Sequence, residues 1–142
     1  MKIFRSIKTS FSQTPLQSDR FKMRIRYVVF ILLGDLVLML KSHYSGPLIR
    51  LVHSYAGNIA VSFAFYFYIG LIMIFIPIKD KQRRLFTAVI ALTGVELFEV
   101  FDGFGIMSNT YDSMDLLANS FGVVIGFITD AILDLRRRTS LV

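Results

Sequence analysis

Apolar residues occur in four long blocks along the chain, separated by short segments rich in charged and turn-forming residues. Within each block the apolar residues are nearly continuous, which is typical of membrane helices and unlike the alternation of a half-buried strand. The pattern therefore predicts an all-α polytopic membrane protein, a bundle of four transmembrane helices. The expected spans cover residues 25–40, 55–78, 85–101 and 114–133.

The last block carries most of its polar residues on one side of the expected helix. At about 100° per residue, seven positions fall within an arc of roughly 120°. They are Asp112, Asp115, Asn119, Gly122, Gly126, Asp130 and Asp134. We expect this side to face protein, water or a ligand, while the opposite, apolar side faces lipid.

Small residues recur every fourth position in the same block. Ala118, Gly122 and Gly126 form two successive steps of the small-xxx-small kind. Such steps allow the backbone of another helix to approach closely. We therefore assign these three residues to helix packing.

An acidic residue also interrupts the first block. Asp35 lies within the expected span 25–40. A charge held against lipid at mid-depth costs several kcal/mol. We therefore expect Asp35 to face the bundle or a water-filled cavity.

Composition and charge agree with the membrane class. The 142 residues are 54% hydrophobic and 18% charged, whereas soluble domains are about 45–50% apolar and about 25% charged. Fourteen of the sixteen Lys and Arg residues lie in three blocks that border apolar runs, at 2–26, 79–84 and 136–138. Cytoplasmic loops carry such an excess of basic residues, so both termini are expected on the cytoplasmic side.

The same charges divide the chain into three parts. We expect a basic cytoplasmic tail over 1–24, a transmembrane domain over 25–135 and a second basic tail over 136–142. Because topology accounts for the net charge of +6, no nucleic acid is expected as a partner. The chain has no cysteine, which excludes disulfides, thiolate nucleophiles and thiolate metal sites.

Acidic residues gather in the second half of the chain. Between Leu85 and Leu135 there are seven acids and no Lys or Arg. One set closes the third expected helix and the other opens the fourth, so antiparallel packing should bring them together near the outer surface. We call the resulting set the outer acidic cluster: Glu96, Glu99, Asp112, Asp115 and Asn119. Asp102 extends it at the end of the third helix.

Several acids at low dielectric need cations, protons or a metal to compensate their charge. On the outer side the expected topology offers Lys41, His43, Arg50 and His53. Arg50 and His53 are three residues apart on one helix face, and we expect both to point into the outer acidic cluster. An Arg50→Ala variant should then behave like a variant that has lost Asp115.

Two segments resemble the two-part signature of the VanZ-like small membrane proteins: GVELFEVF, and then NTYDSMDLLANSFGVVIGF. In that family an acid and a polar residue three later close one helix, and Asp, Asp, Asn and two glycines open the next. The matching positions are Glu96, Glu99, Asp112, Asp115, Asn119, Gly122 and Gly126. The family usually has Gln at the position of Glu99 and an Arg in the connecting loop, for which Arg50 is a candidate substitute.

The resemblance implies a multi-pass protein of the bacterial cytoplasmic membrane that belongs to the cell envelope. One branch of the family is linked to resistance to the glycopeptide teicoplanin, and no reaction is established for it. A related family of short, uncharacterised membrane proteins has a similar organisation and fits the same residues.

Three functions remain open from the sequence. The favoured one is an outward-facing acidic pocket that binds an envelope lipid, a cell-wall-related ligand or a cation. A metal-dependent enzyme acting on a lipid-linked phosphate is less favoured, and would use a divalent cation as its cofactor. A purely structural subunit is the third, in which the carboxylates join helices by hydrogen bonds. The expected partners are the lipid bilayer and either a second copy or another membrane protein.

Overall fold

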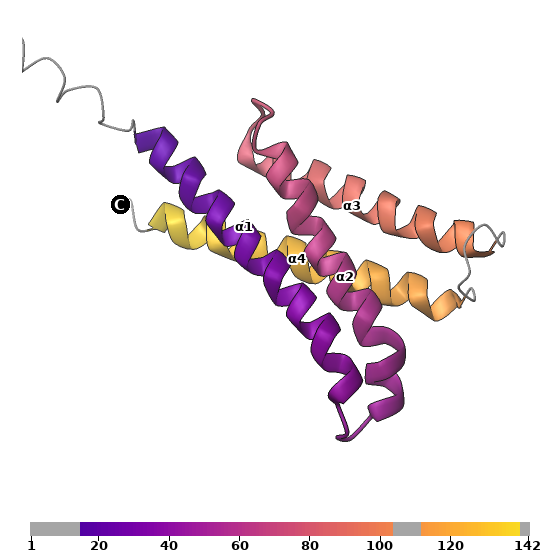
Figure 1. The fold of residues 1–142 in the computed structure, drawn as a ribbon. Coiled ribbons are helices and arrows are strands. Elements are labelled where there is room, and N and C mark those ends of the chain that lie inside the picture. Colours follow the sequence, from indigo (N-terminus) through magenta and orange to yellow (C-terminus); the bar gives the residue numbers. More distant parts are fainter. Residues whose placement is uncertain (1–14, 104–111, 140–142) are drawn as a thin grey trace, which may run out of the picture.

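The computed structural model describes residues 15–103 and 112–139, and within them it is all-helical. The helices are α1 (Pro15–Leu40), α2 (Ile49–Met73), α3 (Asp80–Gly103) and α4 (Ser113–Thr139), and a short 3-10 helix, Lys41–His43, follows α1. α1 and α2 form one antiparallel pair, α3 and α4 form another, and the two pairs cross (Figure 1). α2 packs against all three other helices and is the centre of the bundle.

Several helix boundaries differ from the spans expected from the sequence, and a proline accounts for two of them. α1 begins at Pro15, so residues 15–24, which the sequence assigned to the tail, continue the first span as helix. Proline suits the first helical position, because its fixed φ is helical and its missing N–H would have no partner there. α2 ends at Met73 instead of residue 78, since Pro77 disfavours helical geometry in the residue before it.

The core forms where the pairs cross, and small residues allow the close approach. A Cβ on Gly34 of α1 would lie 2.8 Å from the carbonyl oxygen of Ala60 of α2. A Cβ on Gly126 of α4 would lie 2.9 Å from the ring of Tyr66, and one on Gly122 would strike the Ile59 carbonyl oxygen. Aromatic rings fill the space around α2, with the ring centroids of Phe30 and Phe67 4.7 Å apart.

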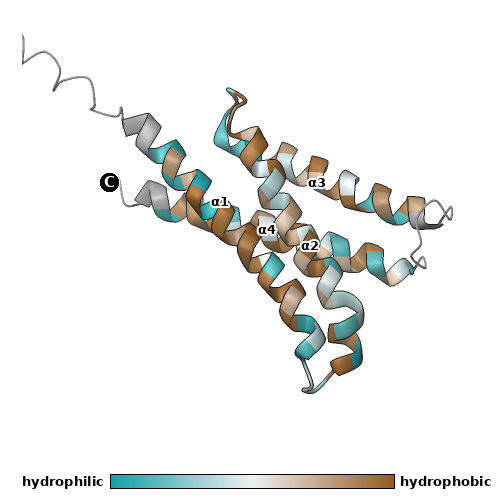
Figure 2. Cartoon of the chain, viewed as in Figure 1, coloured by the Kyte–Doolittle hydropathy of each residue, from teal (hydrophilic) through white to brown (hydrophobic). Residues whose placement is uncertain are grey.

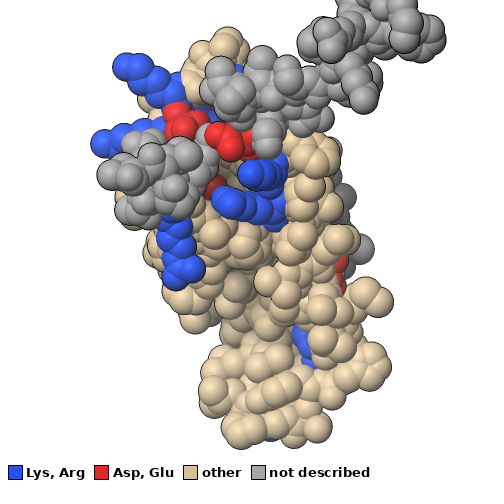
Figure 3. Space-filling model, turned by 90° about the vertical axis from the view of Figure 1, so that its left-hand side faces the viewer, with Lys and Arg blue, Asp and Glu red and all other residues tan. Residues whose placement is uncertain are grey.

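The outside of the bundle is largely apolar. Large hydrophobic side chains are exposed on α1, α2, α3 and α4 alike, and hydrophobic residues predominate between the helix ends (Figure 2). Within the described residues, α2 and the segment Ser113–Arg136 of α4 are long and apolar enough to cross a membrane. Charged side chains gather at one end of the molecule, above a broad uncharged surface (Figure 3).

The prediction that Asp35 faces the bundle is wrong. Its side chain is exposed on the outside of α1 and does not face the bundle. The neighbouring Gly34 is buried against α2. Because consecutive residues of an α-helix are rotated by about 100°, this contact turns Asp35 outward.

Candidate functional site

Three members of the outer acidic cluster form hydrogen bonds between helices. The Tyr55 hydroxyl on α2 donates to Oδ2 of Asp112 at 3.2 Å. Glu96 on α3 accepts a hydrogen bond from Oγ of Ser120 on α4 at 3.0 Å. Oδ1 of Asn119 accepts one from Ser62 of α2 at 2.9 Å. These bonds join α4 to both of its neighbours.

Asp112 also has a local role in starting α4. Its Oδ1 accepts a hydrogen bond from the backbone N–H of Met114 at 3.0 Å. A side-chain oxygen just before a helix satisfies one of the N–H groups that have no partner within it. A single carboxylate therefore caps α4 and contacts α2.

The two remaining members of the outer acidic cluster, Glu99 and Asp115, differ in burial. Glu99 is buried and Asp115 is half-buried. The side chain of Asp102 and the connecting residues 104–111 lie outside the described part of the chain. Among the residues that the structure describes, no group of three or more acidic or histidine side chains could hold a metal ion.

The structure does not bring Arg50 and His53 to the outer acidic cluster. Both side chains are exposed. His53 Nε2 lies 3.1 Å from the carbonyl oxygen of Tyr44, to which its N–H donates. No hydrogen bond or ion pair between the described residues joins either basic side chain to the cluster.

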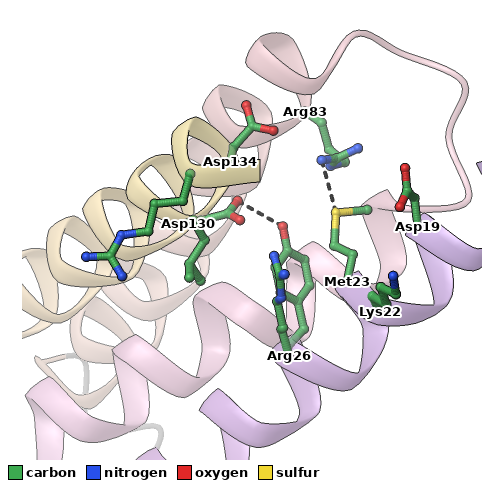
Figure 4. Close-up of a pocket in the computed structure, with 10 residues that line it drawn as sticks. Asp19, Lys22, Met23, Arg26, Arg83, Asp130 and Asp134 are labelled. Atoms are coloured by element: carbon green, nitrogen blue, oxygen red, sulfur yellow. Dashed lines mark hydrogen bonds between the residues drawn. The ribbon is translucent and has the colours of Figure 1, made fainter. Parts of the chain in front are cut away.

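A polar pocket of about 320 Å³ lies at the opposite end of the bundle, between α1, the start of α3 and the end of α4. We call it the basic-end pocket. Its lining includes four basic side chains, those of Lys22, Arg26, Arg83 and Arg136. Three acidic side chains, Asp19, Asp130 and Asp134, complete its charged lining. In Figure 4, Asp19, Arg83 and Asp134 approach the same opening from three different helices.

Asp130 is buried beside this pocket, and two tyrosines hold it. The Tyr27 hydroxyl on α1 donates to Asp130 Oδ2 at 2.8 Å, and the Tyr66 hydroxyl on α2 donates to the same oxygen at 3.3 Å. The Tyr27 bond joins α1 to α4, and the Tyr66 bond joins α2 to α4. One carboxylate thus connects three helices at the wall of the pocket.

Arg83 is the buried cation of the basic-end pocket, with 8% of its surface exposed. Nη1 forms an ion pair with Asp80 at 2.8 Å, and Nη2 donates to the sulfur of Met23 at 3.3 Å. A thioether is a weak acceptor, while a guanidinium carries five N–H donors. Its Nε is buried without a hydrogen-bond partner. The guanidinium therefore has donor capacity that the described residues do not use.

Arg84 and Asp134 form a second ion pair next to the pocket. Arg84 Nη1 lies 2.7 Å from Asp134 Oδ2, and both side chains are largely buried, at 13% and 12% exposure. Partial burial acts to lower the pKa of Arg84, but the hydrogen bond and charge of Asp134 outweigh it. The pKa of Arg84 therefore lies above its ordinary value. The pair joins the first turn of α3 to the last turns of α4.

The sequence interpretation missed this pocket because it treated the basic residues only as topology signals. Two features of the sequence could have indicated it. The polar side of the fourth span continues to Asp130 and Asp134, next to the basic residues 136–138, and Asp19 lies within a basic segment. Acidic residues within or next to basic segments indicate ion pairs or a binding site, because topology alone requires only the basic residues.

The Tyr27–Asp130 bond gives a testable prediction for the attachment of α1. A Tyr27→Phe variant removes one buried hydrogen bond to a carboxylate, and such bonds contribute about 1.5–3 kcal/mol. We expect the free energy of unfolding, measured by denaturant titration in mixed micelles, to fall by about that amount. Tyr55→Phe is the matched control. Its bond to Asp112 is longer and less buried, so a loss equal to that of Tyr27→Phe would contradict the assignment.

The chain was also compared with known proteins. No protein-family model matches it, and neither a curated protein nor a solved structure is significantly similar to it. The resemblance to the VanZ-like family therefore remains a prediction based on the motif residues between 94 and 127.

Proposed function

We propose that this chain is a multi-pass protein of the bacterial cytoplasmic membrane that binds the phosphate head group of an anionic lipid in its basic-end pocket. All four helices span the bilayer in this proposal, and both termini lie on the cytoplasmic side. The observation that carries the proposal is Arg83, a buried guanidinium in the pocket lining with an Nε that has no hydrogen-bond partner.

The membrane setting is supported by the surface and by the positions of the charges. Apolar side chains cover the outside of the bundle, and two helices have the length and composition of spans. The basic-end pocket brings together basic residues from α1, α3 and α4, and each of the three basic blocks contributes at least one of them. This common position agrees with the excess of Lys and Arg at cytoplasmic membrane boundaries.

The choice of ligand follows from the charges in the lining. Asp134 pairs with Arg84, and Asp130 accepts hydrogen bonds from two tyrosines. Lys22 and Arg26 line the pocket and are exposed, so a ligand that enters would meet their side chains first. Arginine and lysine donate charge-assisted hydrogen bonds to phosphate oxygens, so the pocket suits an anion carrying phosphate.

The volume of the pocket and its expected level in the bilayer favour a lipid head group over a larger molecule. Ligand pockets usually occupy about 300–1,000 Å³, and about 320 Å³ is at the small end of that range. In the proposed topology, the end of the helices that carries the basic blocks, and the pocket with it, lies at the level of the anionic head groups of the cytoplasmic leaflet. A lipid can reach it laterally, with its acyl chains against the apolar surface of the bundle.

Titration of the intact protein in micelles tests the proposal. We expect dioleoyl phosphatidylglycerol to bind more tightly than dioleoyl phosphatidylcholine, as measured by native mass spectrometry. Arg83→Gln should weaken binding of the anionic lipid by about tenfold, since it removes a charge-assisted hydrogen bond. Because Arg83 is buried, the exposed pair Lys22→Gln and Arg26→Gln provides a second variant that leaves the core intact.

Arg20→Gln is the matched control. Arg20 is exposed on the same end of α1 and does not line the pocket. An equal loss of affinity in this control would indicate general surface electrostatics and contradict the proposal. Glycerol 3-phosphate tests the source of the phosphate: if it binds as tightly as the lipid, the ligand is a soluble phosphate and not a lipid.

A further inference from the structure

The outside of α1 is broadly exposed, and we call one row of side chains along it the α1 outer stripe. Its members are Phe21, Ile25, Val28, Leu32, Asp35 and Met39, all exposed. Successive members are spaced by four, three, four, three and four residues. This is the heptad spacing by which one helix packs along another. No helix of the described residues covers this stripe.

Asp35 is the one charged residue of the stripe, and its depth makes its exposure costly. It lies ten residues after Ile25, where the expected first span begins. Leu40, where this span and α1 end, lies five residues further on. At about 1.5 Å per residue, Asp35 is about 15 Å from the inner end of the span and about 8 Å from its outer end, which is still within the hydrocarbon layer. Aspartate is too short to reach the interface as Lys and Arg do. A partner must therefore supply hydrogen bonds or an opposite charge at that depth.

A second copy of this chain does not supply that charge. The Lys and Arg residues of the described part lie at or beyond the ends of the expected spans, as Arg26 and Arg50 illustrate. Two copies inserted in the same orientation would bring the stripes together with Asp35 against Asp35, and like charges repel. Charge complementarity instead favours a partner helix with a cation inside the hydrocarbon layer, at the depth of Asp35.

We infer that the α1 outer stripe binds a membrane-spanning helix of a different protein that carries Lys or Arg at the depth of Asp35 and pairs with it. The inference rests on the proposed four-span arrangement, which places α1 in the bilayer. The heptad spacing holds the partner helix along α1, and Asp35 sets its register, as a single polar residue does in a coiled-coil seam. The stripe is separate from the basic-end pocket, since none of its residues lines that pocket.

Energy transfer in phosphatidylcholine vesicles tests this pairing with a defined probe. The chain has no cysteine, so His43→Cys provides one labelling site at the outer end of α1. The probe is a synthetic Leu/Ala transmembrane peptide with one Lys at the depth of Asp35, and the reference peptide has Leu in that place. We expect half-maximal transfer at about tenfold less of the Lys peptide than of the Leu peptide.

Two variants locate the interaction. Asp35→Leu should remove the preference for the Lys peptide, while phosphatidylglycerol binding in micelles stays unchanged and reports an intact fold. Asp35→Leu combined with Val124→Asp moves the acid to an exposed position near the middle of α4. If this variant regains the full preference, the stripe does not determine binding and the inference is overturned.

Other outcomes also decide the matter. Equal transfer from the Lys and Leu peptides to the unaltered Asp35 protein would overturn the inference. Transfer between differently labelled copies that Asp35→Leu abolishes would make a second copy the occupant and overturn it as well. A Leu32→Cys variant that reacts fully with a membrane-impermeant maleimide in intact vesicles would show that α1 is outside the bilayer. That result would remove the four-span proposal, whereas lipid binding at the basic-end pocket is tested independently in micelles.

Discussion

An Arg84→Met variant is expected to lose about 3–5 kcal/mol of unfolding free energy, the usual cost of removing one partner from a buried ion pair. Arg84 and Asp134 are 2.7 Å apart, and both are largely buried. Without the guanidinium, the carboxylate of Asp134 loses the cation that compensates it. Unfolding by dodecyl sulfate in mixed micelles, followed by far-ultraviolet circular dichroism, measures the loss.

Two comparisons separate this effect from a general loss of surface charge. Replacing both partners, Arg84→Met with Asp134→Leu, should recover most of the stability, because well-packed apolar residues often replace a buried ion pair without cost. Asp80→Ala breaks the neighbouring pair with Arg83, in which the Asp80 side chain is 39% exposed. Because the Asp80 side chain is exposed but Arg83 is buried, this pair is intermediate between the surface and the buried case, and we expect a smaller loss than for Arg84→Met. A loss for Asp80→Ala as large as for Arg84→Met would argue against burial as the cause.

Gly122→Ala should destabilise the protein by about 1–3 kcal/mol, the range seen when extra atoms are forced into a packed core. A Cβ at this position would meet the backbone carbonyl of Ile59 on α2, which cannot rotate away. The helices would have to separate, and the Ser62–Asn119 hydrogen bond nearby would lengthen. The same unfolding titration measures the effect.

Gly94→Ala is the control, and the opposite sign is expected for it. A Cβ on Gly94 would lie 2.9 Å from the edge of the Phe65 ring, a side chain that can move. Alanine favours the helix over glycine by about 1 kcal/mol, so this variant should be as stable as the unaltered protein or more stable. Destabilisation of both variants by the same amount would show that helix separation is not specific to Gly122.

The order and class of the helices could be predicted from the sequence, because each apolar block is long and nearly uninterrupted. The all-α prediction is confirmed for the described residues. The ends of the helices were predicted less accurately, since apolar content marks only the apolar part of each helix. α1 extends to Pro15 through a polar segment that no hydropathy pattern identifies as helix.

The candidate site was harder to predict, because side-chain partners depend on how the helices cross. Glu96 and Asn119 were both assigned to the outer acidic cluster. In the structure, each accepts a hydrogen bond from a serine that the sequence pattern did not single out. His53 contacts the local turn at Tyr44 instead of the acids. Arg83 is buried, contacts Met23 of α1 and lines a pocket with residues of α4, an arrangement that no pattern along a single helix reveals.

The central position of α2 has a consequence for how the chain is assembled during synthesis. The ribosome completes α1 and α2 first, and these two can pack together at once through Gly34 and Ala60. The side of α2 that later receives α4, including Ser62 and Tyr66, stays uncovered until α4 has been synthesised and has packed against it. Nascent chains stalled before α4 should therefore leave these hydroxyl groups without their partners on α4.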